Sequence, residues 1–549
     1  MTKKILFLDL AAGIWPHSIQ ALKVLSQLEI DDVEIIHVAC NSAMVGFCPV
    51  RQSRKRTRGQ IDSYKKIDCR DCQFSASVLG YKLQTMGFQS RETSKTIFIE
   101  KKLSAEDSEL VNEAMLKIEG ENFPIDFEFL EAPVVRMALF EWVLKFKKKV
   151  LLPETDEEKR TLLEYVETAI RFSIAGRDLA LRHPEIDSLV CHSPQYVANN
   201  AFTFQFGLKG IHTYFVSGSD NLAEMESSVM VWDWNIQGLT RPDLENWNGA
   251  GAIEVSSKEL TRVNAHISQL TDGRSAFVYS AGGSGKQWLS DKYKPAVSRK
   301  FTVLMTLSSL DEMIAIHTLG QLKTKRYPGR VFSDQESWVL ETIEWFRVRP
   351  HLGLIVRIHP RELPNKRDQV SGQQAKAWEE IFENLPENVV LNHPREQVPL
   401  DTLLANVGAL VTSWSTTALQ AMLREIPVVT YDTHTLSFPA DTHLSSHSKD
   451  QYFENLEAVT SGGSLGDRDS VLAWLTHSMV RGSVEVTGRL FQKLRVSGPK
   501  WSPRILNVID RYFYWFWRPL EAMLTVKKTE DGRRLKRMIM GSKSTLYDY

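Results

Sequence analysis

Short apolar runs alternate with longer segments of helical periodicity along most of this chain. Four runs in the first half have the length and composition of buried strands: 4–9, 33–38, 188–191 and 213–216. Helical patterns separate them, from about 17 to 28 and through much of 104–182. Strands that alternate with helices are typical of a parallel sheet covered by helices. The first half is therefore predicted to form a doubly wound α/β lobe.

The same alternation restarts after the glycine-rich stretch 280–285. Five further runs are predicted as strands: 301–307, 353–358, 389–391, 409–411 and 427–430. A helix is predicted around 335–346, and 549 residues are more than one hydrophobic core usually organises. We therefore expect two α/β lobes, at 1–275 and 295–500, followed by a tail at 501–549.

Composition and charge remove some classes of function. The chain has 67 Lys and Arg residues and 67 Asp and Glu residues, so it lacks the cationic excess that a dedicated nucleic-acid-binding protein needs. We expect no nucleic-acid partner. The first apolar run breaks at Asp9, and no later run reaches the roughly 20 apolar residues of a membrane-spanning helix. A cytoplasmic location is therefore expected.

Two strand ends in the second half carry residues suited to phosphate. The strand 353–358 stops at His359-Pro360, where an imidazole could donate a hydrogen bond. The strand 409–411 runs into the hydroxyl-rich turn 412–417, which opens a helix. Each feature alone has a plain structural interpretation, as a strand-end residue or a helix cap. A second His-Pro-Arg-Glu copy, at 393–396, is interpreted as a coincidence.

Together with the apolar strand after Ile426-Pro427, these motifs resemble the donor lobe of GT-B glycosyltransferases that build bacterial capsule and surface polysaccharides. They are similar to Kdo transferases and to CMP-sugar-dependent sialyl- and polysialyltransferases. The resemblance covers about 300–432 well and the first half loosely. It implies an α/β GT-B fold, with two Rossmann-like lobes facing a cleft and a C-terminal helical extension.

The resemblance also implies a function and a site. The donor would be a CMP-, CDP- or UDP-linked sugar bound in the second lobe, and the acceptor an oligosaccharide or lipid-linked glycan in the first. Catalysis would require no cofactor. The implied donor-binding residues are Ser308, Ser309, Arg357, His359, Ser413, Ser415, Thr416, Thr417 and Gln420.

Two departures from the family pattern keep other functions open. Many relatives have Glu where this chain has Gln420, and the acidic motif that supplies a catalytic base has no clear match. Asp9 and Asp220, which follow predicted strands, are the candidate catalytic carboxylates. The alternatives are a CDP-polyol phosphotransferase of the same fold and a non-catalytic scaffold of a polysaccharide assembly complex.

Four cysteines lie in the segment 40–72: Cys40, Cys48, Cys69 and Cys72. Four thiolates could hold a structural zinc ion. The alternative is a set of reduced cysteines beside a mobile, solvated loop formed by the basic run 51–58.

The C-terminal tail combines aromatic and basic residues. Six aromatics in a row, at 512–517, precede six cations: Lys527, Lys528, Arg533, Arg534, Lys536 and Arg537. Such a segment suits an anionic membrane surface, which would place the protein on the inner face of the cytoplasmic membrane. The alternative is a helix that crosses back to the first lobe and buries its rings.

Overall fold

The chain folds into two compact units. The computed structural model describes residues 2–44, 46–54, 58–89, 96–237, 242–272, 290–319, 331–364, 370–431, 438–463, 466–486, 513–526, 528–529, 531–541 and 546–547. The first unit comprises Met1–Trp142, Leu152–Pro242 and Arg481–Tyr549, and the second comprises Val143–Leu151 and Asp243–Val480. The tail expected as a separate segment at 501–549 therefore belongs to the first unit.

The first unit is built on a mostly parallel sheet in the order β13-β6-β5-β4-β1-β2-β3. Its strands are β1 (Lys3–Asp9), β2 (Val33–Asn41), β3 (Ile97–Glu100), β4 (Ser188–His192), β5 (His212–Gly218), β6 (Ser228–Asp233) and β13 (Val484–Glu485). Strands β1 to β5 run parallel, whereas β6 is antiparallel to β5 and β13 to β6. The strands β3, β6 and β13 were not predicted from the sequence.

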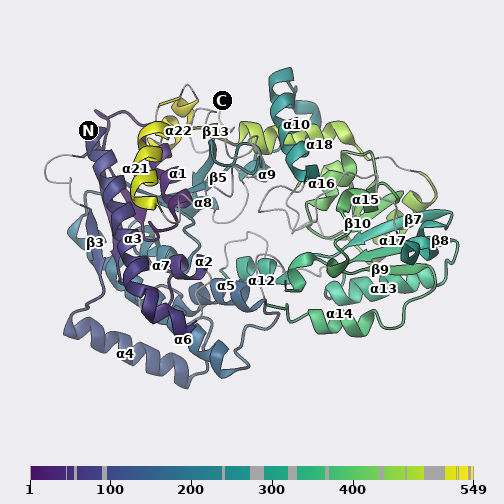
Figure 1. The fold of residues 1–549 in the computed structure, drawn as a ribbon, viewed down its shortest axis with the longest axis horizontal. Coiled ribbons are helices and arrows are strands. Elements are labelled where there is room, and N and C mark those ends of the chain that lie inside the picture. Colours follow the sequence, from purple (N-terminus) through teal and green to yellow (C-terminus); the bar gives the residue numbers. More distant parts are fainter. Residues whose placement is uncertain are drawn as a thin grey trace. The chain divides into compact units, whose positions relative to one another are not determined.

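Helices of the first unit come from both ends of the chain (Figure 1). They are α1 (Trp15–Leu25), α2 (Pro49–Ser53), α3 (Arg58–Thr85), α4 (Ala105–Gly120), α5 (Val134–Phe146), α6 (Asp156–Arg182), α7 (Val197–Gly207), α8 (Trp234–Gln237), α21 (Tyr514–Thr525) and α22 (Gly532–Ile539). Helix α9 (Pro242–Glu245) belongs to the second unit from its second residue on. Leu535 and Ile539 of α22 are fully buried in one core with Phe7 and Leu25. The end of the chain thus completes the first core.

The second unit has an entirely parallel sheet in the order β12-β11-β10-β7-β8-β9. Its strands are β7 (Phe301–Thr306), β8 (Leu352–Arg357), β9 (Val389–Asn392), β10 (Ala409–Thr412), β11 (Val428–Thr430) and β12 (Leu444–Ser445). Its helices are α10 (Ser257–Asp272), α11 (Lys294–Val297), α12 (Leu310–Thr318), α13 (Gln335–Arg347), α14 (Ala375–Ile381), α15 (Leu400–Leu404), α16 (Thr417–Met422), α17 (Lys449–Thr460) and α18 (Arg468–Leu475). Alternate strand residues enter two separate cores, one on each face, as Leu304 and Met305 do.

Both sheets place their first strand centrally and continue outward on either side of it. The chain moves from β1 to β2 and β3 and then returns to β4, and it repeats this order from β7 to β8, β9 and β10. In such sheets, ligands bind where the strand order reverses, at the carboxyl ends of the strands. The predicted fold class, α/β with two Rossmann-like lobes, is confirmed, and each of the nine predicted strands is present.

The expectation of a solvated loop at 51–58 is wrong for the described part of that run. Residues Pro49–Ser53 form α2, and Arg51 is buried, with its guanidinium donating to the Met44 carbonyl at 2.7 Å. Arg54 forms ion pairs with Asp68 and Asp71 of α3. These two basic side chains have partners inside the fold and so are not left to solvent.

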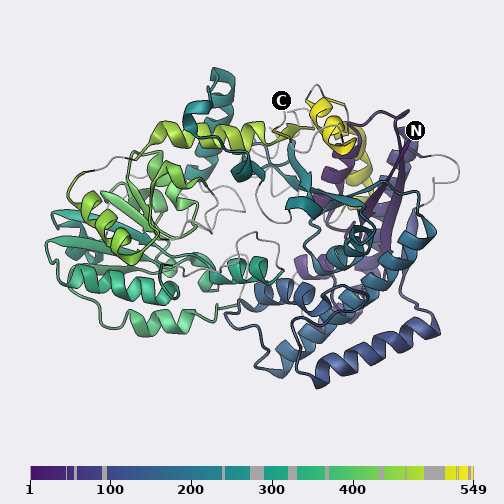
Figure 2. The same cartoon turned by 180° about the vertical axis from the view of Figure 1, so that it is seen from behind.

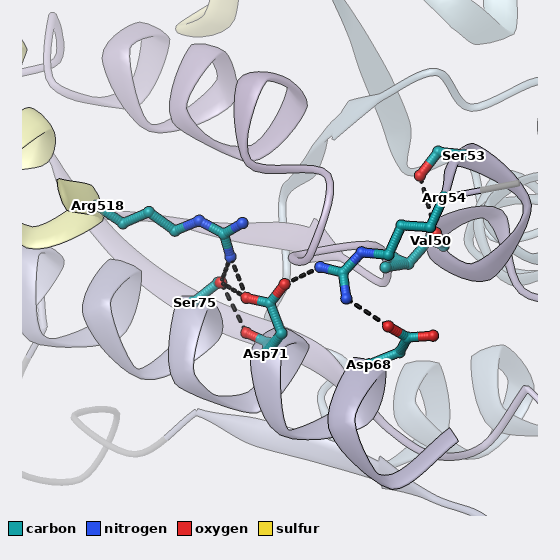
Figure 3. Close-up of polar contacts among 7 residues, drawn as sticks. All are labelled: Val50, Ser53, Arg54, Asp68, Asp71, Ser75 and Arg518. Atoms are coloured by element: carbon teal, nitrogen blue, oxygen red, sulfur yellow. Dashed lines mark hydrogen bonds and ion pairs between the residues drawn. The ribbon is translucent and has the colours of Figure 1, made fainter. Parts of the chain in front are cut away.

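A buried ion network joins α2, α3 and α21 around Asp71 (Figure 3). The Asp71 carboxylate accepts hydrogen bonds from Arg54 and from Arg518, which also donates to the Ser75 hydroxyl. Asp71 and Arg518 are almost fully buried. Because removing one member of a buried charge cluster leaves the others uncompensated, this network is sensitive to its central residue.

We expect Asp71→Ala to lower the free energy of unfolding by about 3–5 kcal/mol, since it leaves two guanidinium groups without their shared carboxylate. Arg518→Met should cost less, about 1–3 kcal/mol, because Arg54 still neutralises Asp71. Chemical denaturation of the two variants measures the difference. Equal losses would show that Asp71 is not the centre of the network.

Candidate functional site

A cluster of hydroxyl groups lies where the strand order of the second sheet reverses. Thr306 ends β7 and Thr412 ends β10, and the two residues are paired in register. The Thr306 hydroxyl donates to the Thr412 hydroxyl at 2.9 Å and lies 2.9 Å from the Thr417 hydroxyl. The Thr417 hydroxyl in turn donates to the Ser415 hydroxyl at 3.1 Å. The sequence predicted Ser415 and Thr417 as donor-binding residues. It placed Thr412 in the hydroxyl-rich turn without assigning it a role, and it gave no signal for Thr306.

Two buried serine hydroxyls at the same strand ends have no hydrogen-bond partner within the described residues. Ser308 follows β7 and Ser413 follows β10, and both side chains are buried. The backbone of Ser308 is fixed by the Gln335 side chain, which accepts from its N–H at 2.8 Å and donates to its C=O at 3.0 Å. A ligand with hydrogen-bond acceptors that binds at this strand-order reversal would give both hydroxyls a partner.

His359 lies at the end of β8, next to β7. Its Nδ1 accepts a hydrogen bond from the Arg361 backbone N–H at 3.3 Å, which leaves the ring proton on Nε2. Burial lowers the pKa of His359 to about 4. The ring is therefore neutral at pH 7, with Nε2 as a hydrogen-bond donor.

The charges that act on His359 are mostly positive. Asp311 raises the pKa of His359, but Arg361, Arg357 and Lys147 all lower it. Arg361 is bonded to Asp311 through its Nε and a terminal nitrogen, the latter at 2.6 Å. Lys147 donates to the Arg361 carbonyl at 2.6 Å. Cations held in place around a neutral donor favour an anionic ligand.

Glu362 is a buried carboxyl group behind this turn. Burial raises the pKa of Glu362 to about 8, and the nearby Asp311 raises it further, while Lys147 opposes the shift. Glu362 is therefore protonated at neutral pH. The Ser309 hydroxyl donates a hydrogen bond to Asp311, so Ser309 belongs to the group of residues around Glu362.

The two His-Pro-Arg-Glu copies adopt the same local turn. Pro360–Glu362 and Pro394–Glu396 are both short 3₁₀ turns, and His393 Nδ1 accepts from the Arg395 N–H at 3.2 Å. The four letters therefore specify a turn. The position differs, because His359 follows the inner strand β8, whereas His393 follows the edge strand β9.

The remaining predicted donor residues are less directly placed. Arg357 is buried and donates to the Asn392 side chain at 2.8 Å and to the Val398 carbonyl at 3.0 Å, toward β9. Thr416 is exposed, and Gln420 is half-buried on α16. A donor contact for these three residues stays a prediction.

In the first unit, Asp9 ends β1 at the equivalent strand-order reversal. The Asp9 carboxylate is buried, accepts from the Ser18 hydroxyl at 2.6 Å and lies 3.8 Å from His37 Nε2. The rings of His17 and His192 stack beside it, with centroids 3.9 Å apart. Burial lowers the pKa of both imidazoles, to about 4 for His17. This histidine pair was missed because its members lie far apart in the sequence.

Asp220 is half-buried in the segment after β5. Whether either Asp9 or Asp220 acts as a base stays a prediction.

The four predicted metal ligands come from one neighbourhood of the first unit. Cys40 lies in β2, Cys48 precedes α2, and Cys69 and Cys72 lie one turn apart on α3. Burial raises the pKa of Cys40 to about 12, and the thiols of Cys48 and Cys69 act on it electrostatically. Within the part of the chain that the structure describes, no three His, Cys, Asp or Glu side chains are positioned to hold a metal ion. A zinc site stays a prediction.

No protein-family model matches this sequence, and no curated protein matches it. Among solved structures, the β-Kdo 2,4-transferase KpsC of Thermosulfurimonas dismutans matches 55% of this chain and 82% of its own, with 9% identity and a TM-score of 0.33. The UDP-GlcNAc 2-epimerase of Neisseria meningitidis bound to UDP-GlcNAc matches 87% and 98%, with 9% identity and a TM-score of 0.26. The spinosyn rhamnosyltransferase SpnG matches 86% and 95%, with 12% identity and a TM-score of 0.25. At these scores the similarities assign no activity.

We expect Ser413→Ala to leave the unliganded protein as stable as the wild type or to stabilise it by about 1 kcal/mol, because it removes a buried hydroxyl without a partner. Thr412→Val, which breaks a hydroxyl hydrogen bond on the same strand, should instead destabilise it by about 1 kcal/mol. Urea denaturation separates the two results. A clear loss of stability in Ser413→Ala would mean that its hydroxyl is already paired.

Glu362→Gln should reduce the pH dependence of stability. The carboxyl ionises near 4.5 when unfolded and near 8 when folded, so the folded chain binds more protons between these values. Stability from this group therefore falls as pH rises through that window. In thermal scans from pH 5 to 8, we expect Tm to fall less with rising pH in the variant than in the wild type. Each kcal/mol of pH-dependent stability that the substitution removes should make this fall smaller by about 2–4 °C. Parallel pH profiles would contradict the buried neutral carboxyl.

Proposed function

We propose that this protein is a glycosyltransferase that moves a sugar from a nucleotide-activated donor to a surface-polysaccharide acceptor, such as capsule or lipopolysaccharide. The observation that carries the proposal is the pair of buried hydroxyls of Ser308 and Ser413 at the strand-order reversal of the second sheet, which have no hydrogen-bond partner among the described residues. They lie on adjacent strand ends, beside the Thr306 hydroxyl cluster.

The donor groups at this edge suit the phosphate of a nucleotide sugar. Phosphate oxygens only accept hydrogen bonds, and Ser308, Ser413 and His359 Nε2 are all donors. The fixed cations around His359 add a positive potential without requiring that the imidazole be protonated. The motif resemblance of this region to CMP-sugar-dependent enzymes favours a pyrimidine nucleotide, linked as CMP, CDP or UDP.

The proposed reaction exchanges one bond of the sugar for another. The bond from the anomeric carbon to the nucleotide phosphate oxygen breaks, and an acceptor hydroxyl oxygen forms the new bond and loses its proton to a base. Hydrogen bonds that strengthen as charge develops on the departing phosphate lower the barrier. We assign this task to His359 and the serine hydroxyls, with no metal required. Asp9 and Asp220 in the first lobe remain the proposed bases, near the proposed acceptor site.

We expect His359→Ala to lower donor kcat/KM at least about tenfold, since a hydrogen bond to a charged group is worth about 1.5–3 kcal/mol. The matched control is His393→Ala, which removes the same ring from the same local turn at the edge strand. The control should keep wild-type kinetics. Both variants should unfold at the wild-type temperature within a few degrees.

The assay uses CMP-, CDP- and UDP-linked sugars and follows release of the nucleotide. Equal effects of the two substitutions would contradict the assignment of His359. Transfer of a polyol phosphate from a CDP-linked donor would replace the proposed reaction by the phosphotransferase alternative. If none of CMP, CDP and UDP shifts the melting temperature of the protein, the scaffold alternative is favoured.

A further inference from the structure

Helix α21 buries both of its charged side chains and exposes several of its large apolar ones, although Trp517 is buried. Arg518 is bonded to Asp71 and Ser75, and the Glu521 carboxylate accepts from Trp15 Nε1 at 2.9 Å. Five large apolar side chains on and next to this helix are between 43% and 62% exposed: Phe513, Trp515, Phe516, Met523 and Leu524. Helices that face water show the opposite distribution.

The exposed side chains form one continuous face. Positions 513, 516, 520 and 523–524 recur every three or four residues, which places them on the same side of a helix. Pro519 is exposed on that side, and Leu520 is half-buried. Within the described stretch 513–526, the exposed side carries no charged residue. An apolar patch of this kind on a protein surface marks an interaction site.

We propose that this face of α21 seats the protein on a lipid bilayer that carries anionic headgroups. Tryptophan and phenylalanine suit the boundary between headgroups and acyl chains. The helix has 12 residues, and its length of about 18 Å is well short of a hydrocarbon core of about 30 Å. It therefore lies in the plane of the membrane surface. Within the described residues, no helix is long and apolar enough to cross a membrane.

The charge of the neighbouring helix supports this occupant. Helix α22 lies beside α21 in both views (Figures 1 and 2). Arg533 and Arg537 are exposed on α22 and lie four residues apart, on one side of it. Exposed guanidinium groups on a neighbouring helix complement anionic headgroups.

Three cations of the tail are held by partners within the first unit. Lys528 pairs with Glu29, and Lys536 pairs with Asp32 at 2.7 Å. Arg534 donates to the carbonyls of Ser483 and Leu546. Lys527 lies outside the described residues. These three side chains are engaged within the unit, so apolar burial makes the larger contribution to binding.

Vesicle flotation of the full-length chain tests the proposal. One set of vesicles contains phosphatidylcholine alone, and the other also contains phosphatidylglycerol. The double variant Trp515→Ser with Phe516→Ser should lower the partition coefficient at least about tenfold, because two rings no longer leave water. The matched control, Leu116→Ser with Leu181→Ser, changes side chains that are 73% and 63% exposed elsewhere in the same unit, and it should bind like the wild type.

Salt and oligomeric state complete the test. Wild-type binding to phosphatidylglycerol vesicles should weaken by less than about tenfold in 0.5 M salt, since few cations contribute. No binding of the wild type, or equal loss in both double variants, would overturn the proposal. A wild-type dimer that the Trp515 and Phe516 substitutions convert to monomer would also overturn it, by assigning the face to a second copy of the chain.

Discussion

The order of the strands in the second sheet is the constraint on which the candidate site depends. Because β7 lies between β8 and β10, the chain segments that leave β7 and β10 meet at one edge although about a hundred residues separate them. The hydrogen bond between the Thr306 and Thr412 hydroxyls joins the last residues of these two strands. Ser308 and Ser413, one or two residues further along, are then held at the reversal by backbone that belongs to the core. The site inherits its rigidity from the sheet.

Several features of the site lower the stability of the unliganded protein. Two buried hydroxyls lack partners among the described residues, a histidine is kept neutral among cations, and a carboxyl is kept protonated behind it. Each arrangement opposes stability, and such groups concentrate where a ligand supplies the missing interactions. A phosphate would accept from the hydroxyls and from His359 Nε2 and would be attracted by the surrounding cations. These separate features therefore have one common explanation.

Much of the fold could be predicted because strands buried on both faces read as continuous apolar runs, as at 301–307. The strand β3 was missed because its four residues lie at the sheet edge and are half-exposed. The basic run at 51–58 was wrongly predicted to be solvated because the ion network that holds Arg54 forms only in the folded chain. Its central carboxylate, Asp71, binds both Arg54 and Arg518, and Arg518 is 447 residues away from Asp71 in the sequence. At the site, the turn at His359 was predictable, but its difference from His393 depends on strand order. Thr306 was hidden within the apolar run that it ends.

The most direct test of the central claim is a crystal structure of the full-length protein with a bound pyrimidine nucleotide, such as CMP or UDP. The proposed function places the nucleotide phosphate at the carboxyl edge of β7 and β10, within hydrogen-bonding distance of the Ser308 and Ser413 hydroxyls and of His359 Nε2. A nucleotide bound at the sheet of the first unit, or a phosphate that leaves both serine hydroxyls unpaired, would contradict it.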